Sequence, residues 1–226
     1  MMTVTKEPMS VNRRILQSPS TGMRAVVYPA RKSGGDERRV IVYLHGSGGF
    51  TAGMAGLYEY PDFPALLEAG MALDCDAVIP VCHRGDRWQS PMIDRFLDDY
   101  ERHFDGPERG YDFIGYSRGG LGVYRYGADH PGRMRTGVVV SSQGLDDACE
   151  KISTVPMFLI HGTEDDLIPA TESQRMCDRI VASGGACILR LRPGDHYIAG
   201  TVLADPSVYR WQRTARDVPD AVPGSK

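Results

Sequence analysis

The segment YDFIGYSRGG contains a serine whose neighbours suit nucleophilic chemistry. Gly115, Ser117 and Gly119 form the pattern G-x-S-x-G between a predicted strand and a predicted helix. A sharp strand-to-helix turn strains the serine backbone and exposes its hydroxyl, and glycines let strand and helix approach closely. The backbone N–H of Arg118 would then lie at a helix N-terminus, where it favours a developing oxyanion. The pattern also fits an ordinary tight turn, so a catalytic interpretation of Ser117 requires partners.

A serine hydroxyl is a weak nucleophile that usually needs a histidine base and an acid to orient that histidine. His196, which follows the last predicted strand in LRPGDHYIAG, is the best candidate base among six histidines. His45 and His161 each end an apolar strand before a glycine, a position suited to shaping a loop. The remaining histidines precede any plausible acid in the chain: His83, His103 and His130. The sequence therefore predicts His196 as the general base.

Asp165 is the candidate acid because it follows an earlier predicted strand in MFLIHGTEDDLIP. The chain order Ser117, Asp165, His196 is that of α/β-hydrolases, and it differs from the orders in chymotrypsin and subtilisin. Each residue follows the carboxyl end of a different strand, and in open α/β sheets ligands bind at that edge.

The elements that must position these residues alternate along the chain. Apolar runs rich in β-branched residues predict strands near 23–28, 40–44, 77–81, 111–114, 137–140, 157–160 and 187–191. Helix-like segments lie near 61–69, 91–104, 118–129, 171–182 and 206–216. VIVYL and MFLI are continuously apolar, as expected of strands covered on both faces. This order predicts an α/β fold, a mostly parallel, doubly wound sheet of about seven to eight strands with no large cap domain.

Three motifs resemble the α/β-hydrolase superfamily, and the resemblance extends from Met23 to Arg216. VIVYLHGSGG is similar to the strand and H-G turn that supply one oxyanion-hole amide, FIGYSRGG to the nucleophile elbow, and HGTEDDLIP to the turn that bears the acid. The resemblance implies that Asp165, rather than Glu164 or Asp166, is the acid and that Ser47 donates a second backbone N–H.

Within that superfamily, the predicted layout without a lid resembles the small carboxylesterase, dienelactone-hydrolase and prolyl-oligopeptidase-like branch. One departure is Asp195, which precedes the histidine where many relatives carry glycine. Asp195 is interpreted as a turn residue, with perturbation of the base as the alternative.

Residues that follow two of the predicted strands are candidates for substrate binding. Phe50 belongs to the segment 47–63, and Arg84 and Trp88 belong to HRGDRW. We expect both segments to flank the nucleophile, where aromatic side chains would line a pocket for the acyl or alcohol group. Packing of the loops onto the domain explains Phe50 and Trp88 equally well. Arg84 or Arg87 would suit a substrate carboxylate, with surface solvation as the alternative.

Composition and charge exclude several other classes of protein. The chain has 226 residues, 42% hydrophobic and 24% charged, which fits one folded domain over 1–226 with its ordered core at roughly 11–216. A net charge of -3, with arginines interleaved among acids, argues against nucleic acid as a partner. No secretory signal or membrane span is evident, and the five scattered cysteines show no disulfide or zinc spacing, so we expect a cytoplasmic location. The sequence predicts no oligomeric state.

These observations predict a serine hydrolase, specifically a carboxylesterase that forms an acyl-enzyme on a small-molecule ester or other acyl substrate. No cofactor is expected, because the chain has no metal triad and GSGG lacks the G-K-[ST] of a phosphate-binding loop. A thioesterase, peptidase or acyltransferase would use the same triad. A non-catalytic ligand-binding protein of the same fold is an alternative of another class, and it would usually lack a triad member.

Overall fold

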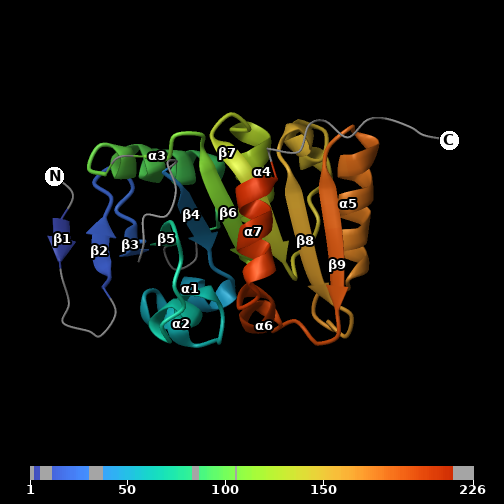
Figure 1. Cartoon of the computed structure of the whole chain (residues 1–226), viewed down its shortest axis with the longest axis horizontal. Coiled ribbons are helices and arrows are strands. Elements are labelled where there is room, and N and C mark those ends of the chain that lie inside the picture. The colour runs from blue at the N-terminus through green and yellow to red at the C-terminus, as the bar shows by residue number, and fades with distance from the viewer. Residues whose placement is uncertain (1–2, 6–11, 31–37, 83–86, 105, 216–226) are drawn as a thin grey trace.

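The described part of the chain is built around one nine-stranded sheet (Figure 1). The structure is a computed structural model, and it describes residues 3–5, 12–30, 38–82, 87–104 and 106–215, without the side chains of 3–5 and 49–51. The strands are β1 (Thr3–Thr5), β2 (Arg14–Gln17), β3 (Arg24–Tyr28), β4 (Val40–Leu44), β5 (Asp76–Val81), β6 (Tyr111–Tyr116), β7 (Met134–Val140), β8 (Met157–Gly162) and β9 (Cys187–Arg192).

The strand order is β1-β2-β3-β5-β4-β6-β7-β8-β9. The six strands from β5 to β9 in this order pair in parallel, whereas β1, β2 and β3 add an antiparallel edge beside β5. The chain leaves β4 toward β5 on one side and later returns to β6 on the other. Such a reversal opens a crevice at the carboxyl ends of the two central strands, here β4 and β6.

Short helices fill the connections. The α-helices are α1 (Ser47–Ala52), α2 (Phe63–Glu68), α3 (Ser90–Glu101), α4 (Arg118–Asp129), α5 (Thr171–Ala182), α6 (Ala199–Leu203) and α7 (Pro206–Thr214). The 3-10 helices are η1 (Ala55–Tyr58), η2 (Asp146–Ala148) and η3 (Lys151–Thr154). No helix in these described segments is long and apolar enough to cross a bilayer.

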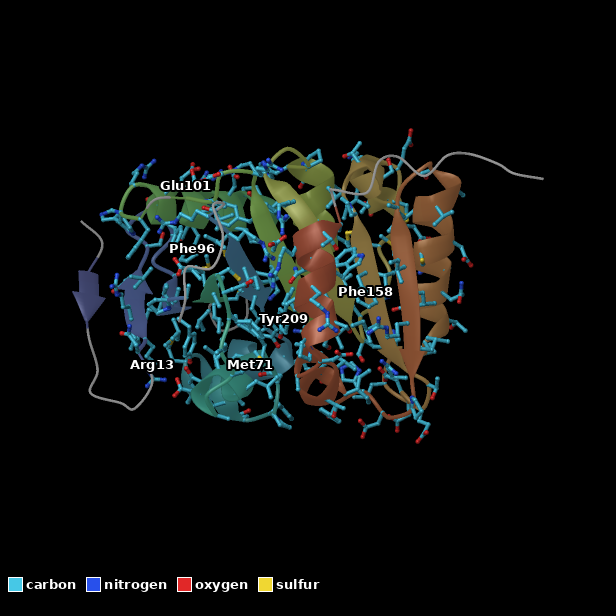
Figure 2. The ribbon with its side chains drawn as sticks, viewed as in Figure 1. Arg13, Met71, Phe96, Glu101, Phe158 and Tyr209 are labelled. Atoms are coloured by element: carbon cyan, nitrogen blue, oxygen red, sulfur yellow. The ribbon has the colours of Figure 1, made fainter. Side chains whose placement is uncertain are left out.

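Two hydrophobic cores lie on opposite faces of the sheet, as β4 illustrates. Val42 and Leu44 belong to the core that α3, α4 and α5 cover, whereas Ile41 and Tyr43 belong to the core under α2, α6 and α7. Figure 1 shows α7 crossing in front of the sheet, and its Tyr209 is labelled in Figure 2. Because both faces are buried, β4 must be apolar at every position, as its sequence VIVYL is.

A buried ion cluster ties together the three central strands. The carboxylate of Asp112 on β6 accepts hydrogen bonds from Arg39, just before β4, and from Arg135 on β7, at distances of 2.7 to 3.1 Å. The hydroxyl of Thr136 donates a further bond of 2.6 Å to the same carboxylate. Charges buried this deeply need partners, and here two guanidinium groups share one carboxylate. The cluster fixes the strand that leads to Ser117.

The mostly parallel α/β fold is confirmed, with differences in detail. The sheet has nine strands rather than seven to eight, because β1 and β2 extend its antiparallel edge. β1 lies in a segment expected to be loose, and it is ordered by pairing with β2. The segment after β4 was expected to be a loop, but it folds into α1 and η1.

Candidate active site

Ser117 lies at the turn between β6 and α4, as its sequence pattern predicts. Its backbone has φ 53° and ψ -118°, a conformation that residues other than glycine rarely adopt. The Ser117 N–H donates to the carbonyl of Val140 at 2.9 Å, and its carbonyl accepts from Gly120 N–H at 2.9 Å. These bonds hold the strained turn in place.

The glycines around Ser117 are sterically required. A Cβ on Gly119 would lie 1.8 Å from the carbonyl oxygen of Leu44, so α4 packs directly against the end of β4. A Cβ on Gly115 would lie 2.5 Å from the oxygen of Gly119. The close approach of strand and helix therefore depends on the pattern that first identified the site.

Two hydrogen bonds link Ser117 to His196 and His196 to Asp165. The Nε2 of His196 is 3.0 Å from the Ser117 Oγ, and its Nδ1 is 2.8 Å from Oδ2 of Asp165. Because a carboxylate only accepts, the His196 proton belongs on Nδ1, which leaves Nε2 to accept from the serine hydroxyl. Ser117, Asp165 and His196 are all buried, so the chain of bonds is shielded from competing water.

Asp165 is held as a carboxylate by the loop that follows β8. Its Oδ1 accepts from the backbone N–H groups of Leu167 and Ile168 at 3.0 and 2.8 Å. Burial opposes ionisation of Asp165, but the hydrogen bonds from Ile168 and His196 outweigh it and lower the pKa of the carboxyl. The neighbouring Glu164 and Asp166 are exposed. Of these three acids, Asp165 is the one that bonds to His196.

A second histidine contacts the same carboxylate, which sequence reasoning missed. The Nε2 of His161, on β8, lies 3.1 Å from Oδ2 of Asp165 and 2.9 Å from the carbonyl of Ile168. Both partners accept, so this Nε2 carries a proton. The Nδ1 of His161 lies 2.6 Å from the hydroxyl of Ser173 in α5. The H-G-x-x-D spacing contained this signal, because the turn brings positions 161 and 165 together.

The turn after β4 is organised by His45, in the loop-shaping role that its position predicts. Its Nε2 accepts from the Cys82 N–H at 3.1 Å, its Nδ1 lies 2.7 Å from the carbonyl of Gly46, and its own carbonyl accepts from the Trp88 indole at 3.0 Å. Burial lowers the pKa of His45 to about 4, so the ring is neutral. Ser47 follows as the first residue of α1, where N–H groups have no intrahelical acceptor.

Ser117 borders two cavities. The smaller, of about 160 Å³, is lined by Gly46, Tyr60, Asp62 and Tyr116, and the larger, of about 420 Å³, by side chains of α4 and of the segment before α3. Ser47, Ser117 and His196 line both. Arg118, whose N–H begins α4, lines the larger cavity. Two cavities of different size and lining therefore border Ser117.

The predicted substrate-binding residues have different outcomes. Trp88 lines the larger cavity but is only 1% exposed. A Cβ added to Gly122 of α4 would lie 2.7 Å from the Trp88 Cβ, so Trp88 also packs closely against α4. Phe50 lies in α1, and its side chain is outside the described residues, as is the whole of Arg84. Tyr60 belongs to the segment 47–63, whose aromatic side chains were predicted to line a pocket, and it lines the smaller cavity. Sequence reasoning did not identify Asp62, because it belongs to no motif.

Asp195 behaves as the turn residue that was expected. It is exposed, and its Oδ1 accepts from the backbone N–H of Tyr197 at 2.8 Å.

Two of the other histidines are not part of the chain of hydrogen bonds at Ser117. His103 bonds to the carbonyl of Asp99, and His130 stacks on Tyr126. His83 is outside the described residues. Among the residues that are described, no three or more His, Cys, Asp or Glu side chains gather as a metal site requires.

Comparison with known proteins gives structural neighbours only. No family model and no curated protein matches the sequence. A thermostable esterase matches with a TM-score of 0.67 and 14% identity over 94% of this chain, which spans 62% of that esterase. Est1E from Butyrivibrio proteoclasticus matches at 0.68 and 14% identity, covering 91% of this chain and 99% of its own. A ferulic acid esterase matches at 0.61 and 15% identity, covering 93% and 98%. Together with the topology of the sheet, these neighbours show that the chain has the α/β-hydrolase fold.

Proposed function

We propose that the protein is a serine hydrolase that cleaves carboxylic esters through an acyl-enzyme intermediate. The observation that carries the proposal is the hydrogen-bonded sequence Ser117–His196–Asp165, with distances of 3.0 and 2.8 Å. A serine, a histidine and a carboxylate in this geometry supply a nucleophile, its base and the group that orients the base. The esterases among the structural neighbours support the same assignment by analogy of fold.

The proposed reaction has two acyl-transfer steps. Nε2 of His196 takes the hydroxyl proton as Ser117 Oγ attacks the ester carbonyl, and the same nitrogen then protonates the leaving alcohol. Water, deprotonated by His196, attacks the acyl-enzyme and releases the acid and free Ser117. Asp165 stabilises the imidazolium that forms in each step, through its bond to Nδ1.

The backbone N–H groups of Ser47 and Arg118 are the proposed oxyanion-hole donors. Each is the first residue of a helix, α1 or α4, and both residues line the cavity that contains Ser117. Donors fixed in this way stabilise the negative charge that develops on the carbonyl oxygen, without reorganising during the reaction.

The same geometry would also serve a thioesterase, a small peptidase or an acyltransferase. We favour an ester because cavities flank the nucleophile directly and the described residues contain no large cap that would select peptides. The five cysteines are free thiols, four of them buried, which fits the predicted cytoplasmic location.

Covalent labelling tests the proposal. We expect a fluorophosphonate probe to label the wild-type protein but not Ser117→Ala, and the wild type to hydrolyse short p-nitrophenyl esters and, more weakly or not at all, the matching thioesters. Asp165→Asn should lower kcat by about 10³- to 10⁴-fold, whereas the exposed neighbour Asp166→Asn should keep wild-type turnover. A wild-type protein that is neither labelled nor active would refute the hydrolase assignment, and would favour a non-catalytic binding protein of the same fold.

A further inference from the structure

The larger cavity beside Ser117 has an unusual charge. Its volume is about 420 Å³, and three arginines line it: Arg87, Arg118 and Arg125. Arg118 and Arg125 are seven positions apart on α4, so they lie on the same face of the helix, and Arg87 approaches from the segment before α3. Gln143 also lines the cavity, and none of the described residues that line it is Asp or Glu. We call this cavity the arginine pocket.

Several arginines elsewhere in the described chain are paired with carboxylates. Arg135 bonds to Asp112, and Arg133 contacts three acids on α3. Another cavity, of about 670 Å³ beside the loop that carries His196, is lined by Arg190 and Arg192, but both lie within 3.9 Å of Asp205. Beside Ser117, by contrast, the described residues that line the cavity include three arginines and no acid, in a protein whose net charge is -3.

The position of Arg125 shows how one of these charges is held. Its Nη1 donates to the carbonyl of Trp88 at 3.4 Å, which directs the guanidinium toward the segment that carries Arg87. That partner is a neutral backbone group, and no described carboxylate forms an ion pair with Arg125 or Arg87. Because Arg87 and Arg125 both line the same cavity, an anion that enters it is attracted by two positive charges.

We propose that the substrate is an ester with an anionic group, a carboxylate or a phosphate, that binds in the arginine pocket while its ester carbonyl lies at Ser117. This inference rests on the proposed hydrolase function. Guanidinium groups bind carboxylates and phosphates through paired, charge-assisted hydrogen bonds, and the amide of Gln143 offers a further donor. Because Ser117 and His196 line the same pocket, an anion bound there is part of the reacting substrate rather than a distant effector.

Matched charged and neutral esters test the inference on both sides of the scissile bond. For an anion in the acyl half, p-nitrophenyl hydrogen glutarate is compared with neutral p-nitrophenyl glutaramate. For an anion in the alcohol half, the acetate esters of glycolate and of glycol phosphate are compared with that of neutral glycolamide. We expect the wild type to prefer the charged ester in at least one half by about tenfold or more in kcat/KM. The preferred anion distinguishes a carboxylate from a phosphate substrate.

Two variants attribute the preference to the pocket. Arg87→Gln and Arg125→Gln should each reduce the ratio of charged to neutral kcat/KM by roughly tenfold, the loss expected for one charge-assisted hydrogen bond. Arg87 is exposed, so its replacement leaves the core intact even if the half-buried Arg125 affects folding. The control is Arg95→Gln, an exposed arginine on α3 outside the pocket, which should leave the ratio unchanged.

Each result has one interpretation. If the wild type cleaves charged and neutral esters equally in both halves, or if the preference survives both arginine substitutions, the arginine pocket does not bind the substrate, although the hydrolase assignment stands. If no ester is cleaved and a fluorophosphonate does not label Ser117, the hydrolase assignment fails, and the inference fails with it.

Discussion

Replacing Asp62 by Asn should stabilise the protein at alkaline pH. The Asp62 side chain borders the smaller cavity, is only 7% exposed, and accepts one hydrogen bond, from the hydroxyl of Tyr43 at 3.0 Å. Its Oδ1 is buried without a partner in the described structure. Burial raises the pKa of Asp62 to about 7, although the Tyr43 bond partly opposes that shift. The folded protein therefore keeps a proton on Asp62 that the unfolded chain loses.

The sign and size of the effect follow from proton binding. Because the folded state binds the proton more tightly, stability falls as pH rises from 3.8, the unfolded value, to about 7. The whole shift corresponds to about 4 kcal/mol, of which about 3 kcal/mol is lost between pH 5 and pH 8. Asn cannot ionise, and it still offers an oxygen to Tyr43, so Asp62→Asn escapes this loss.

Urea unfolding at pH 5, 6, 7 and 8 measures the effect. The free energy of unfolding of Asp62→Asn, minus that of the wild type, should increase by about 3 kcal/mol between pH 5 and pH 8. Glu59→Gln removes an exposed carboxylate from the same segment, and should change this difference by less than about 0.5 kcal/mol. A difference for Asp62→Asn that is flat across this range would show that Asp62 is ionised at pH 5 in the folded protein, and would refute the argument from burial.

Three further predictions concern the site and the strands that support it. Gly119→Ala should abolish fluorophosphonate labelling and lower the melting temperature, because the added Cβ would lie 1.8 Å from the backbone oxygen of Leu44. Gly132→Ala, whose Cβ would have no atom within 4 Å, should behave like the wild type. Equal melting temperatures for the two variants would contradict the packing of α4 on β4. Asp112→Asn should cost about 3–5 kcal/mol in urea unfolding, because two buried guanidinium groups lose the carboxylate that they share, and Arg39 keeps the more distant Asp74 at 3.8 Å. A loss below about 1 kcal/mol would mean that water reaches the two guanidinium groups. His161→Asn should lower kcat by about ten- to a hundredfold, with KM little changed, because it removes the N–H that donates to Asp165. The amide of His161→Gln can replace that donor, so this variant should recover most of the activity. Equal losses in the two variants would assign His161 a purely structural role.

The parts of the fold that the sequence predicted are those under the strongest local constraint. The strand 40–44 and the helices 118–129 and 171–182 have the boundaries that their patterns predict. The strand must be apolar throughout because both of its faces are buried, and the helices carry a clear apolar face. In contrast, only Leu16 of β2 is fully buried, so that strand has almost no apolar pattern.

The site shows the same division. Ser117, Asp165 and His196 were identifiable because each belongs to a motif with a fixed position after a strand. α1 was missed because its sequence, SGGFTA, contains two glycines and no helical periodicity, so tertiary contacts must stabilise it. Arg87 was a candidate for binding a substrate carboxylate, but its proximity to Arg125 and Gln143 could not be predicted, because the three residues come from separate segments and are brought together by the packing of α4.

The bond between Ser117 and His196 spans 79 positions of the chain, and β7, β8 and β9 must pair between them before it can form. Parallel strands cannot zip up from a hairpin, and contacts between residues far apart in sequence form slowly. The reactive serine therefore reports on the completed topology rather than on early helix formation. In a refolding experiment, labelling of Ser117 should return with the slowest phase, after the recovery of helical signal.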